Sequence, residues 1–200
     1  MVKICVLVSG GGTNLQALID AEKTGIITSG KISLVVSNKK DAYALTRAEN
    51  NGIKTATVIK KECKDAKEFE DKIIDLLEEN EIELIILAGF MCILSAEFTR
   101  KYENRIINVH PSLIPSFCGA GFYGLHVHEA ALNYGVKVTG ATVHFVNEIP
   151  DGGKIIAQKA VEILDGDTPE ILQKRVMENA EWIILPRAAE KICKEIKEGK

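Results

Sequence analysis

Alternating strand and helix patterns over residues 1–110 constrain the fold of this chain more than any other feature. Five short runs rich in β-branched and apolar residues are separated by glycine-containing turns and by segments with helical spacing of apolar residues. The runs are Val2–Val8, Ile32–Val36, Thr55–Ile59, Glu83–Ala88 and Ile106–His110. Because such alternation requires crossover connections, it is typical of parallel sheets with right-handed crossovers. We therefore predict an α/β protein with a single doubly wound, mostly parallel sheet.

The pattern changes after residue 110. Two β-rich runs, Lys137–Val146 and Lys154–Val161, flank a short connection and predict an antiparallel pair added to the sheet. Thr168 followed by Pro169 is typical of a helix N-terminus, so we predict a long C-terminal helix from this point. Pro186 is expected to bend or break that helix. No repeat, low-complexity segment or linker divides the chain, so residues 1–200 are expected to form one domain.

Composition excludes several classes of protein. The formal net charge is −3, which gives no electrostatic basis for binding nucleic acid. The five cysteines are widely spaced and contain no C-x-x-C pair, so neither a disulfide framework nor a zinc site is indicated. The first residues enter a strand without a signal-peptide layout, and no apolar run is long enough to span a membrane. We therefore expect a cytoplasmic protein with no membrane partner.

The first predicted strand leads into a glycine-rich turn, Ser9–Asn14, which opens a helix. The free N–H groups and the positive dipole end of such a helix suit a phosphate. The dinucleotide pattern G-x-G-x-x-G fails because its third glycine is replaced by Leu15, and no Gly-Lys-Ser/Thr of a Walker loop follows. The turn therefore favours a single phosphate monoester over a dinucleotide, and a tight turn without a ligand remains the alternative.

A polar pair ends the fifth predicted strand. Asn108 and His110 share one face of an extended chain, roughly 6–7 Å apart, and Pro111 and Pro115 stop the strand. An amide donor beside an imidazole at the carboxyl end of a parallel strand lies where open α/β sheets place their chemistry. The alternative is that the histidine and the turn asparagine have only structural roles. We would prefer that interpretation for either residue alone, but for the pair we favour a functional role.

Further polar residues could join this pair. Asp151 lies in a Pro-Asp-Gly-Gly turn, and aspartate is a common turn residue, so a structural role is enough to explain its presence. The functional alternative is that its carboxylate lies near His110 and favours the imidazolium. His144 lies on a predicted strand, as a core histidine or as part of the site wall. His126 and His128 could ligate a metal with His110 and Asp151, but they lack a diagnostic spacing, so we predict no metal. No nucleophile elbow is present, which favours direct transfer between two substrates.

Several motifs together resemble the folate-dependent glycinamide ribonucleotide formyltransferases, across nearly the whole chain. They are Ser9–Leu15, Leu87–Met91, Ile107–Pro115, Thr142–Val146 and Asp151–Gly153. The resemblance implies a Rossmann-like formyltransferase fold and transfer of a formyl group from 10-formyltetrahydrofolate to the amine of glycinamide ribonucleotide, in purine synthesis. It implies a phosphate- and ribonucleotide-binding half, residues 1–110, and a folate-side and catalytic-loop half, residues 111–200. The protein would be a monomer or a homodimer.

The resemblance also implies roles for individual residues. Asn108 and protonated His110 would stabilise the oxyanion, and Asp151 would keep His110 charged. The ribonucleotide would contact Gly11, Gly12, Thr13, Asn14 and Glu181. The folate would contact Met91, Cys92, Ile93, Leu94, Asn108, Asn147 and Asp151. Cys92 stands where family members commonly carry an arginine, and Lys64 and Lys67 are candidates for holding the folate tail.

Three other functions compete with this one. A methionyl-tRNA formyltransferase would carry a C-terminal tRNA domain, and a formyltetrahydrofolate hydrolase an N-terminal regulatory domain; we expect neither here. The third alternative is a non-catalytic nucleotide-phosphate-binding module that uses only the glycine-rich turn. It would leave Asn108, His110 and Asp151 without a role.

Overall fold

The computed structural model describes residues 1–199. Its sheet has seven strands in the order β3-β2-β1-β4-β5-β6-β7. The strands are β1 (Val2–Val8), β2 (Gly30–Ser37), β3 (Lys54–Thr57), β4 (Leu84–Leu87), β5 (Ile106–His110), β6 (Val138–Phe145) and β7 (Ile155–Glu162). β1 to β5 pair in parallel, and β6 and β7 pair antiparallel. The predicted doubly wound sheet with an antiparallel extension is confirmed.

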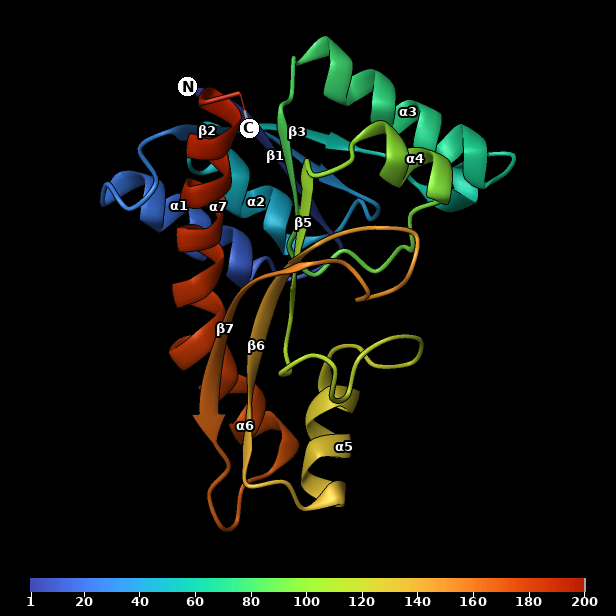
Figure 1. The fold of residues 1–200 in the computed structure, drawn as a ribbon. Coiled ribbons are helices and arrows are strands. Elements are labelled where there is room, and N and C mark those ends of the chain that lie inside the picture. The colour runs from blue at the N-terminus through green and yellow to red at the C-terminus, as the bar shows by residue number, and fades with distance from the viewer. Residues whose placement is uncertain (200) are drawn as a thin grey trace.

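Helices cover both faces of the parallel strands (Figure 1). They are α1 (Thr13–Lys23), α2 (Tyr43–Glu49), α3 (Ala66–Glu79), α4 (Ala96–Lys101), α5 (Leu125–Tyr134), α6 (Pro169–Val176) and α7 (Trp182–Lys197), with a 3-10 turn at Lys60–Glu62. Alternate residues of β1 point to opposite faces, so Ile4 and Val6 pack with α1 and α7. Cys5 and Leu7 pack with α3 and α4. Burial on both faces explains why β1 is a nearly continuous apolar run.

Side-chain caps fix where several helices begin. The Ser95 hydroxyl accepts a hydrogen bond from the Phe98 N–H at the start of α4. The Thr168 hydroxyl accepts one from the Ile171 N–H at the start of α6, and Pro169 occupies the first helical position. The start of α6 was predicted from Thr168 and Pro169. In both helices the hydroxyl oxygen satisfies an N–H group that lacks a partner within the helix.

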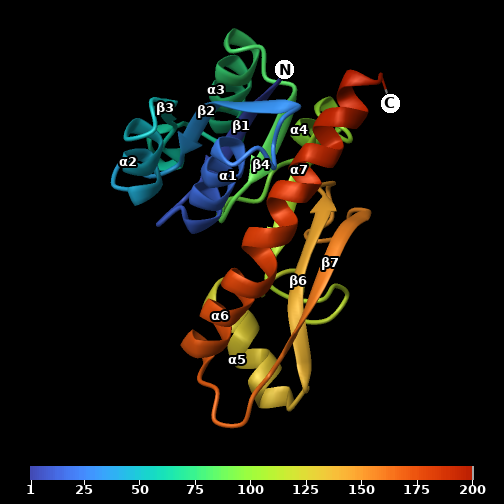
Figure 2. The same ribbon diagram turned by 90° about the vertical axis from the view of Figure 1, so that its left-hand side faces the viewer.

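A π-helical turn, Met177–Glu181, joins α6 to α7. The prediction that Pro186 bends or breaks the last helix is wrong with respect to a break, because α7 continues through Pro186 to Lys197. We attribute the absence of a break to the π-helical turn that directly precedes α7. Its wider backbone gives space to the proline ring, which would otherwise clash with the preceding turn of the helix. Figure 2 shows α6 and α7 crossing the length of the molecule.

The two ends of the described chain lie at the same end of the molecule (Figures 1 and 2). The Val2 N–H donates to the Ser29 carbonyl at the start of β1. Glu190 of α7 accepts hydrogen bonds from Thr28 and Ser29, so the last turns of α7 lie beside the amino ends of β1 and β2. The carboxyl ends of the parallel strands, where the candidate site lies, face the other way.

No helix within residues 1–199 is both long and apolar enough to cross a membrane.

Candidate active site

One cavity of about 700 Å³ lies at the carboxyl ends of β4 and β5. The residues that line it come from both predicted halves of the chain, including Asn14, Met91 and Asn108 from the first and Asp151 and Glu181 from the second. A crevice outside the carboxyl ends of parallel strands is where open α/β sheets bind ligands. The described lining contains no lysine or arginine, so its charged side chains are carboxylates and its bases are histidines.

β5 and β6 place two polar pairs side by side. Asn108 lies opposite His144 in the antiparallel register, and His110 lies opposite Thr142. Asn108, His110 and His144 line the cavity, as the alternation of side chains along a strand predicts for Asn108 and His110. Thr142 is buried away from the cavity, where its hydroxyl donates to the Ser112 carbonyl and accepts from the Ile114 N–H. Thr142 thereby fixes the loop that follows His110.

Asp151 reaches His110 from the β6–β7 connection. Its Oδ2 lies 3.5 Å from His110 Nδ1, and its Oδ1 lies 3.5 Å from His144 Nε2. Asp151 has a φ of 56°, in the left-handed region that aspartate tolerates in turns. A Cβ on the nearby Gly153 would lie 1.7 Å from the Phe145 carbonyl oxygen, so the turn requires glycine there. The Pro-Asp-Gly-Gly turn therefore delivers the carboxylate to the two histidines.

Backbone groups of the segment after Pro115 form hydrogen bonds with His110 and Asp151. His110 Nε2 lies 2.8 Å from the Phe117 carbonyl oxygen, so Nε2 donates and carries a proton. The Gly119 N–H donates to Asp151 Oδ2 at 2.8 Å. The Phe117 ring packs edge-on against Phe122 and Tyr134, which holds this segment over the site.

The pKa values of His110 and Asp151 are both lowered, but for different reasons. Burial lowers the pKa of His110, and the Asp151 charge and the Phe117 carbonyl oppose this shift without cancelling it. Burial would raise the pKa of Asp151, but the hydrogen bonds from His144 and Gly119 and the charge of His110 lower it overall. The Asp151 charge therefore favours protonated His110, as predicted, while burial of the ring acts in the opposite direction.

His144 orients Asn108. His144 Nδ1 lies 2.7 Å from the Phe145 carbonyl, so Nδ1 donates there. His144 Nε2 lies 3.3 Å from the Asn108 amide nitrogen and 3.5 Å from Asp151 Oδ1. This contact holds the Asn108 amide beside the His144 ring in the wall of the cavity.

The glycine-rich turn begins α1 with Gly12 in the left-handed region, φ 73°. A Cβ there would lie 2.6 Å from the Ala44 Cβ, so α2 excludes any larger residue. No side chain caps α1 and no acidic residue occupies its first turn, which leaves its N–H groups and dipole open to an anion. Gly11, Gly12 and Thr13 are not among the residues that line the cavity, whereas Asn14 is.

Asn14 and Glu181 meet at this end of the cavity. The Asn14 amide donates to Glu181 Oε2 at 2.6 Å, across 167 positions of sequence. Glu181 is buried, and burial raises its pKa to about 7, although the bond from Asn14 acts the other way. The Thr13 hydroxyl lies 3.8 Å from the Met177 sulfur. The π-helical turn thus contacts the start of α1 and places Glu181 in the cavity.

An apolar wall closes the other end. Met91, Cys92, Ile93 and Leu94 line the cavity after β4, and Asn147 and Asp151 line it from the β6–β7 connection. With Asn108 on β5, all seven predicted folate residues therefore line one cavity. Met91 is 52% exposed and Ile93 is 74% exposed, so this wall opens to solvent as an apolar mouth. The Cys92 thiol accepts a hydrogen bond from Asn38 at 3.1 Å and supplies no positive charge.

The two predicted folate-tail residues are not brought to the cavity. Lys67 pairs with Asp71 on its own helix at 3.0 Å. The Lys64 side chain is exposed, and its backbone N–H donates to Glu68. Neither lysine lines the cavity.

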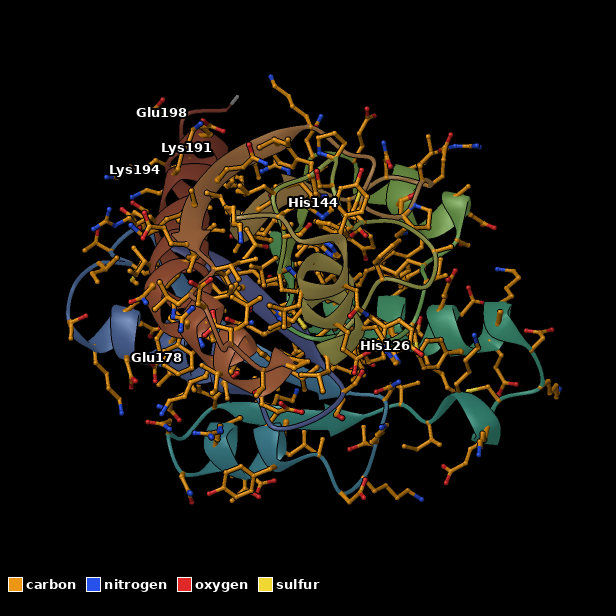
Figure 3. The ribbon with its side chains drawn as sticks, turned by 90° about the horizontal axis from the view of Figure 1, so that it is seen from below. His126, His144, Glu178, Lys191, Lys194 and Glu198 are labelled. Atoms are coloured by element: carbon orange, nitrogen blue, oxygen red, sulfur yellow. The ribbon has the colours of Figure 1, made fainter. Side chains whose placement is uncertain are left out.

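His126 and His128 have different surroundings. His126 is exposed and pairs with Glu129, and Figure 3 shows it well separated from His144. His128 is buried in the cavity wall. Within residues 1–199, no three His, Cys, Asp or Glu side chains are grouped to hold a metal ion.

Sequence reasoning missed three contributors to the site. Phe117 and Gly119 act through backbone atoms, which every residue possesses, so no side-chain pattern could have indicated them. His128 was considered only as a metal ligand. A stronger signal was available for it, because a histidine on the buried face of an amphipathic helix needs hydrogen-bond partners.

The doubly wound sheet, with Asn108, His110 and Asp151 grouped at its carboxyl edge, is the arrangement expected of a formyltransferase. Comparison with known proteins agrees. The formyl transferase family model matches residues 2–189, and the chain belongs to this family. The chain is 43% identical over 186 residues to the phosphoribosylglycinamide formyltransferase of Haemophilus influenzae, covering 93% of this chain and 84% of that protein.

Two further relatives extend the comparison. The chain is 47% identical over 192 residues to a trifunctional purine biosynthetic protein of Gallus gallus, which covers 96% of this chain but only 18% of that protein. The crystal structure of glycinamide ribonucleotide transformylase 1 from Symbiobacterium toebii superposes with a TM-score of 0.91 at 38% identity, covering 98% of this chain and 89% of that one.

Proposed function

We propose that the protein transfers the formyl group of 10-formyltetrahydrofolate to the amine of glycinamide ribonucleotide, a step of purine biosynthesis. One observation carries this proposal: Asn108, His110 and Asp151 line a single cavity. The uncapped N-terminus of α1, which suits a phosphate, lies at one end of this cavity, and the apolar wall after β4 lies at the other. The names of two relatives, a phosphoribosylglycinamide formyltransferase and a glycinamide ribonucleotide transformylase, support the proposed acceptor and the transferred group. The reaction needs two bound substrates, and the cavity has two chemically different ends.

The catalytic residues would act as follows. The amine nitrogen attacks the formyl carbon, and the carbonyl oxygen becomes an oxyanion that Asn108 and His110 stabilise by donated hydrogen bonds. Collapse of this intermediate breaks the bond from carbon to the folate nitrogen, which takes up a proton as the amine loses one. Ionised Asp151 raises the proton affinity of His110 and lies within 3.5 Å of its ring. Preorganised donors in a partly buried site supply most of the rate enhancement.

Each end of the cavity would hold one substrate. The open N–H groups at Gly11, Gly12 and Thr13 would bind the phosphate, while Asn14 and Glu181 would contact the ribose. Met91–Leu94 and Asn147 would hold the pterin between apolar and polar walls. The carboxylates of the folate tail would lie beyond the mouth, since the described lining holds no cation. These are small cytoplasmic substrates, and nothing in the proposed chemistry calls for a metal, a membrane or nucleic acid.

Purified protein with 10-formyltetrahydrofolate, with and without glycinamide ribonucleotide, tests the proposal. Tetrahydrofolate formation followed by absorbance is expected only when the ribonucleotide is present. Turnover with water alone would indicate a hydrolase. No turnover under either condition would overturn the assignment in favour of a phosphate-binding module.

His110→Ala tests the assigned chemistry. Loss of an oxyanion donor should lower kcat by about 100- to 1000-fold. Ribonucleotide affinity, measured by calorimetry, should change little, because the phosphate contacts lie at the other end of the cavity. His126→Ala is the matched control, since His126 is exposed and outside the lining. Near-normal turnover of His110→Ala would remove His110 from the mechanism.

A further inference from the structure

His128 is a buried histidine whose ring nitrogens have no hydrogen-bond partner. The residue is 1% exposed, and neither Nδ1 nor Nε2 has a hydrogen-bond partner within residues 1–199. A buried polar group without a partner destabilises a fold, so such groups are rare in native proteins. His144 shows the contrast, because its two ring nitrogens contact the Phe145 carbonyl and the Asn108 amide.

The position of His128 is at the substrate cavity. It lies on α5, which packs against α6, and it lines the cavity together with Gln173, Met177 and Glu181. It is also close enough to His110 for the two rings to interact electrostatically. His128 therefore lies on the wall that joins the Glu181 end of the cavity to the catalytic pair.

The charge state of His128 limits what it can bind. Burial, with a smaller effect from His110, lowers its pKa to about 4, so the ring is neutral at pH 7. A neutral imidazole offers one N–H donor and one acceptor nitrogen, and no protein contact fixes which nitrogen is which. This is unsuited to a phosphate and suited to an uncharged group that both donates and accepts, such as an amide.

We propose that His128 is a substrate-binding residue that hydrogen-bonds the uncharged glycinamide arm of the ribonucleotide. This inference rests on the proposed function, in which that arm runs from the ribose near Glu181 to the reacting amine near His110. Binding would satisfy the ring that folding leaves unpaired. His128 would thus select for an amide-bearing substrate and aim its amine at the formyl carbon, which makes it a specificity residue rather than a proton-transfer group.

His128→Leu separates this role from a structural one. Leucine removes the unpaired nitrogens and keeps an apolar side chain of similar size, so the melting temperature should rise or stay unchanged. The Kd for glycinamide ribonucleotide, measured by calorimetry, should rise about tenfold, as expected for one lost hydrogen bond and a partner left unsatisfied. The KM for 10-formyltetrahydrofolate should stay within twofold of the wild type.

Two controls complete the design. His128→Gln retains a donor and an acceptor and should recover part of the lost ribonucleotide affinity. His126→Leu changes an exposed histidine on the same helix and should leave both substrates unaffected.

Each outcome decides the inference. An unchanged ribonucleotide Kd in His128→Leu, or a lower melting temperature, would overturn it in favour of a structural histidine. A wild-type protein that binds the ribonucleotide without turnover would contradict the proposed function alone, and the calorimetric comparison would still decide the role of His128. A wild-type protein that does not bind the ribonucleotide would overturn both.

Discussion

Atoms of the main chain, as much as side chains, hold His110 and Asp151 in place. The Phe117 carbonyl accepts from His110, and the Gly119 N–H donates to Asp151. With Nε2 donating to Phe117, the second ring nitrogen faces the Asp151 carboxylate at 3.5 Å. In the proposed mechanism, an oxyanion that accepts a hydrogen bond from Nε2 would compete with the Phe117 carbonyl, so the placement of this loop would affect the reaction.

Asp151→Asn should make the His110 ring harder to protonate. The carboxylate charge raises the pKa of His110 against the larger effect of burial, so its removal should lower that pKa further. NMR titration of the His110 ring should give a midpoint at lower pH in the variant than in the wild type. We expect kcat to fall by about 100-fold or more. A midpoint that is unchanged or higher would show that Asp151 does not act on His110 through its charge.

At the level of single residues, the strand pattern alone placed Asn108 and His110 on one face. The residues alone left the meeting of Asp151 with His110 as one of two alternatives, because a contact between residues 41 positions apart depends on the path of β6 and β7. The resemblance to a family favoured that contact. The balance between burial and charge at His110 could not be predicted either. It depends on how much of the ring the Phe117 segment covers.

Among the elements, α7 is anchored through one carboxylate. Glu190 accepts hydrogen bonds from the N–H groups and hydroxyls of Thr28 and Ser29. Burial of Glu190 would raise its pKa, but these four hydrogen bonds outweigh it and lower the pKa to about 2. The bonds tie the last long helix to the segment that leads into β2.

Glu190→Gln should destabilise the fold in a pH-dependent way. Because the pKa is lowered from 4.5 to about 2 on folding, the ionised carboxylate stabilises the native state above pH 4.5. The difference corresponds to roughly 3 kcal/mol at most. Urea unfolding should show the largest gap between wild type and variant near pH 7, with the gap closing as the pH falls from about 4.5 toward 2. A gap that does not depend on pH would contradict this account.

The sequence predicted the elements better than their irregularities. The limits of β1 match the predicted range, and Thr168 caps the helix that it was expected to cap. These signals are local, because periodicity and caps involve residues within one or two turns. The π-helical turn at Met177–Glu181 has no comparable local signal. It reconciles two requirements, the packing of α6 and α7 on the sheet and the placement of Glu181 in the cavity.

For the molecule as a whole, the cavity and the chain ends face opposite ways. Glu190 and Val2 both contact Ser29 near the amino ends of β1 and β2, whereas the cavity lies at the carboxyl ends of β4 and β5. A well-folded domain joined after residue 200 should therefore leave kcat/KM within about twofold. The same domain inserted between Ile149 and Pro150, which line the cavity, should abolish turnover. Equal effects of the two insertions would contradict this orientation.

The placement of the two ends also has an evolutionary consequence. A domain whose two ends lie opposite its main cavity can be joined to other domains without a change in the residues that line that cavity. The matched region of the Gallus gallus trifunctional protein makes up only 18% of that polypeptide, whereas the Haemophilus influenzae relative is matched over 84% of its length. Regions similar to this chain thus occur in both short and long polypeptides. Because both ends of the chain lie opposite the cavity, fusion to another domain need not disturb the fold or the cavity.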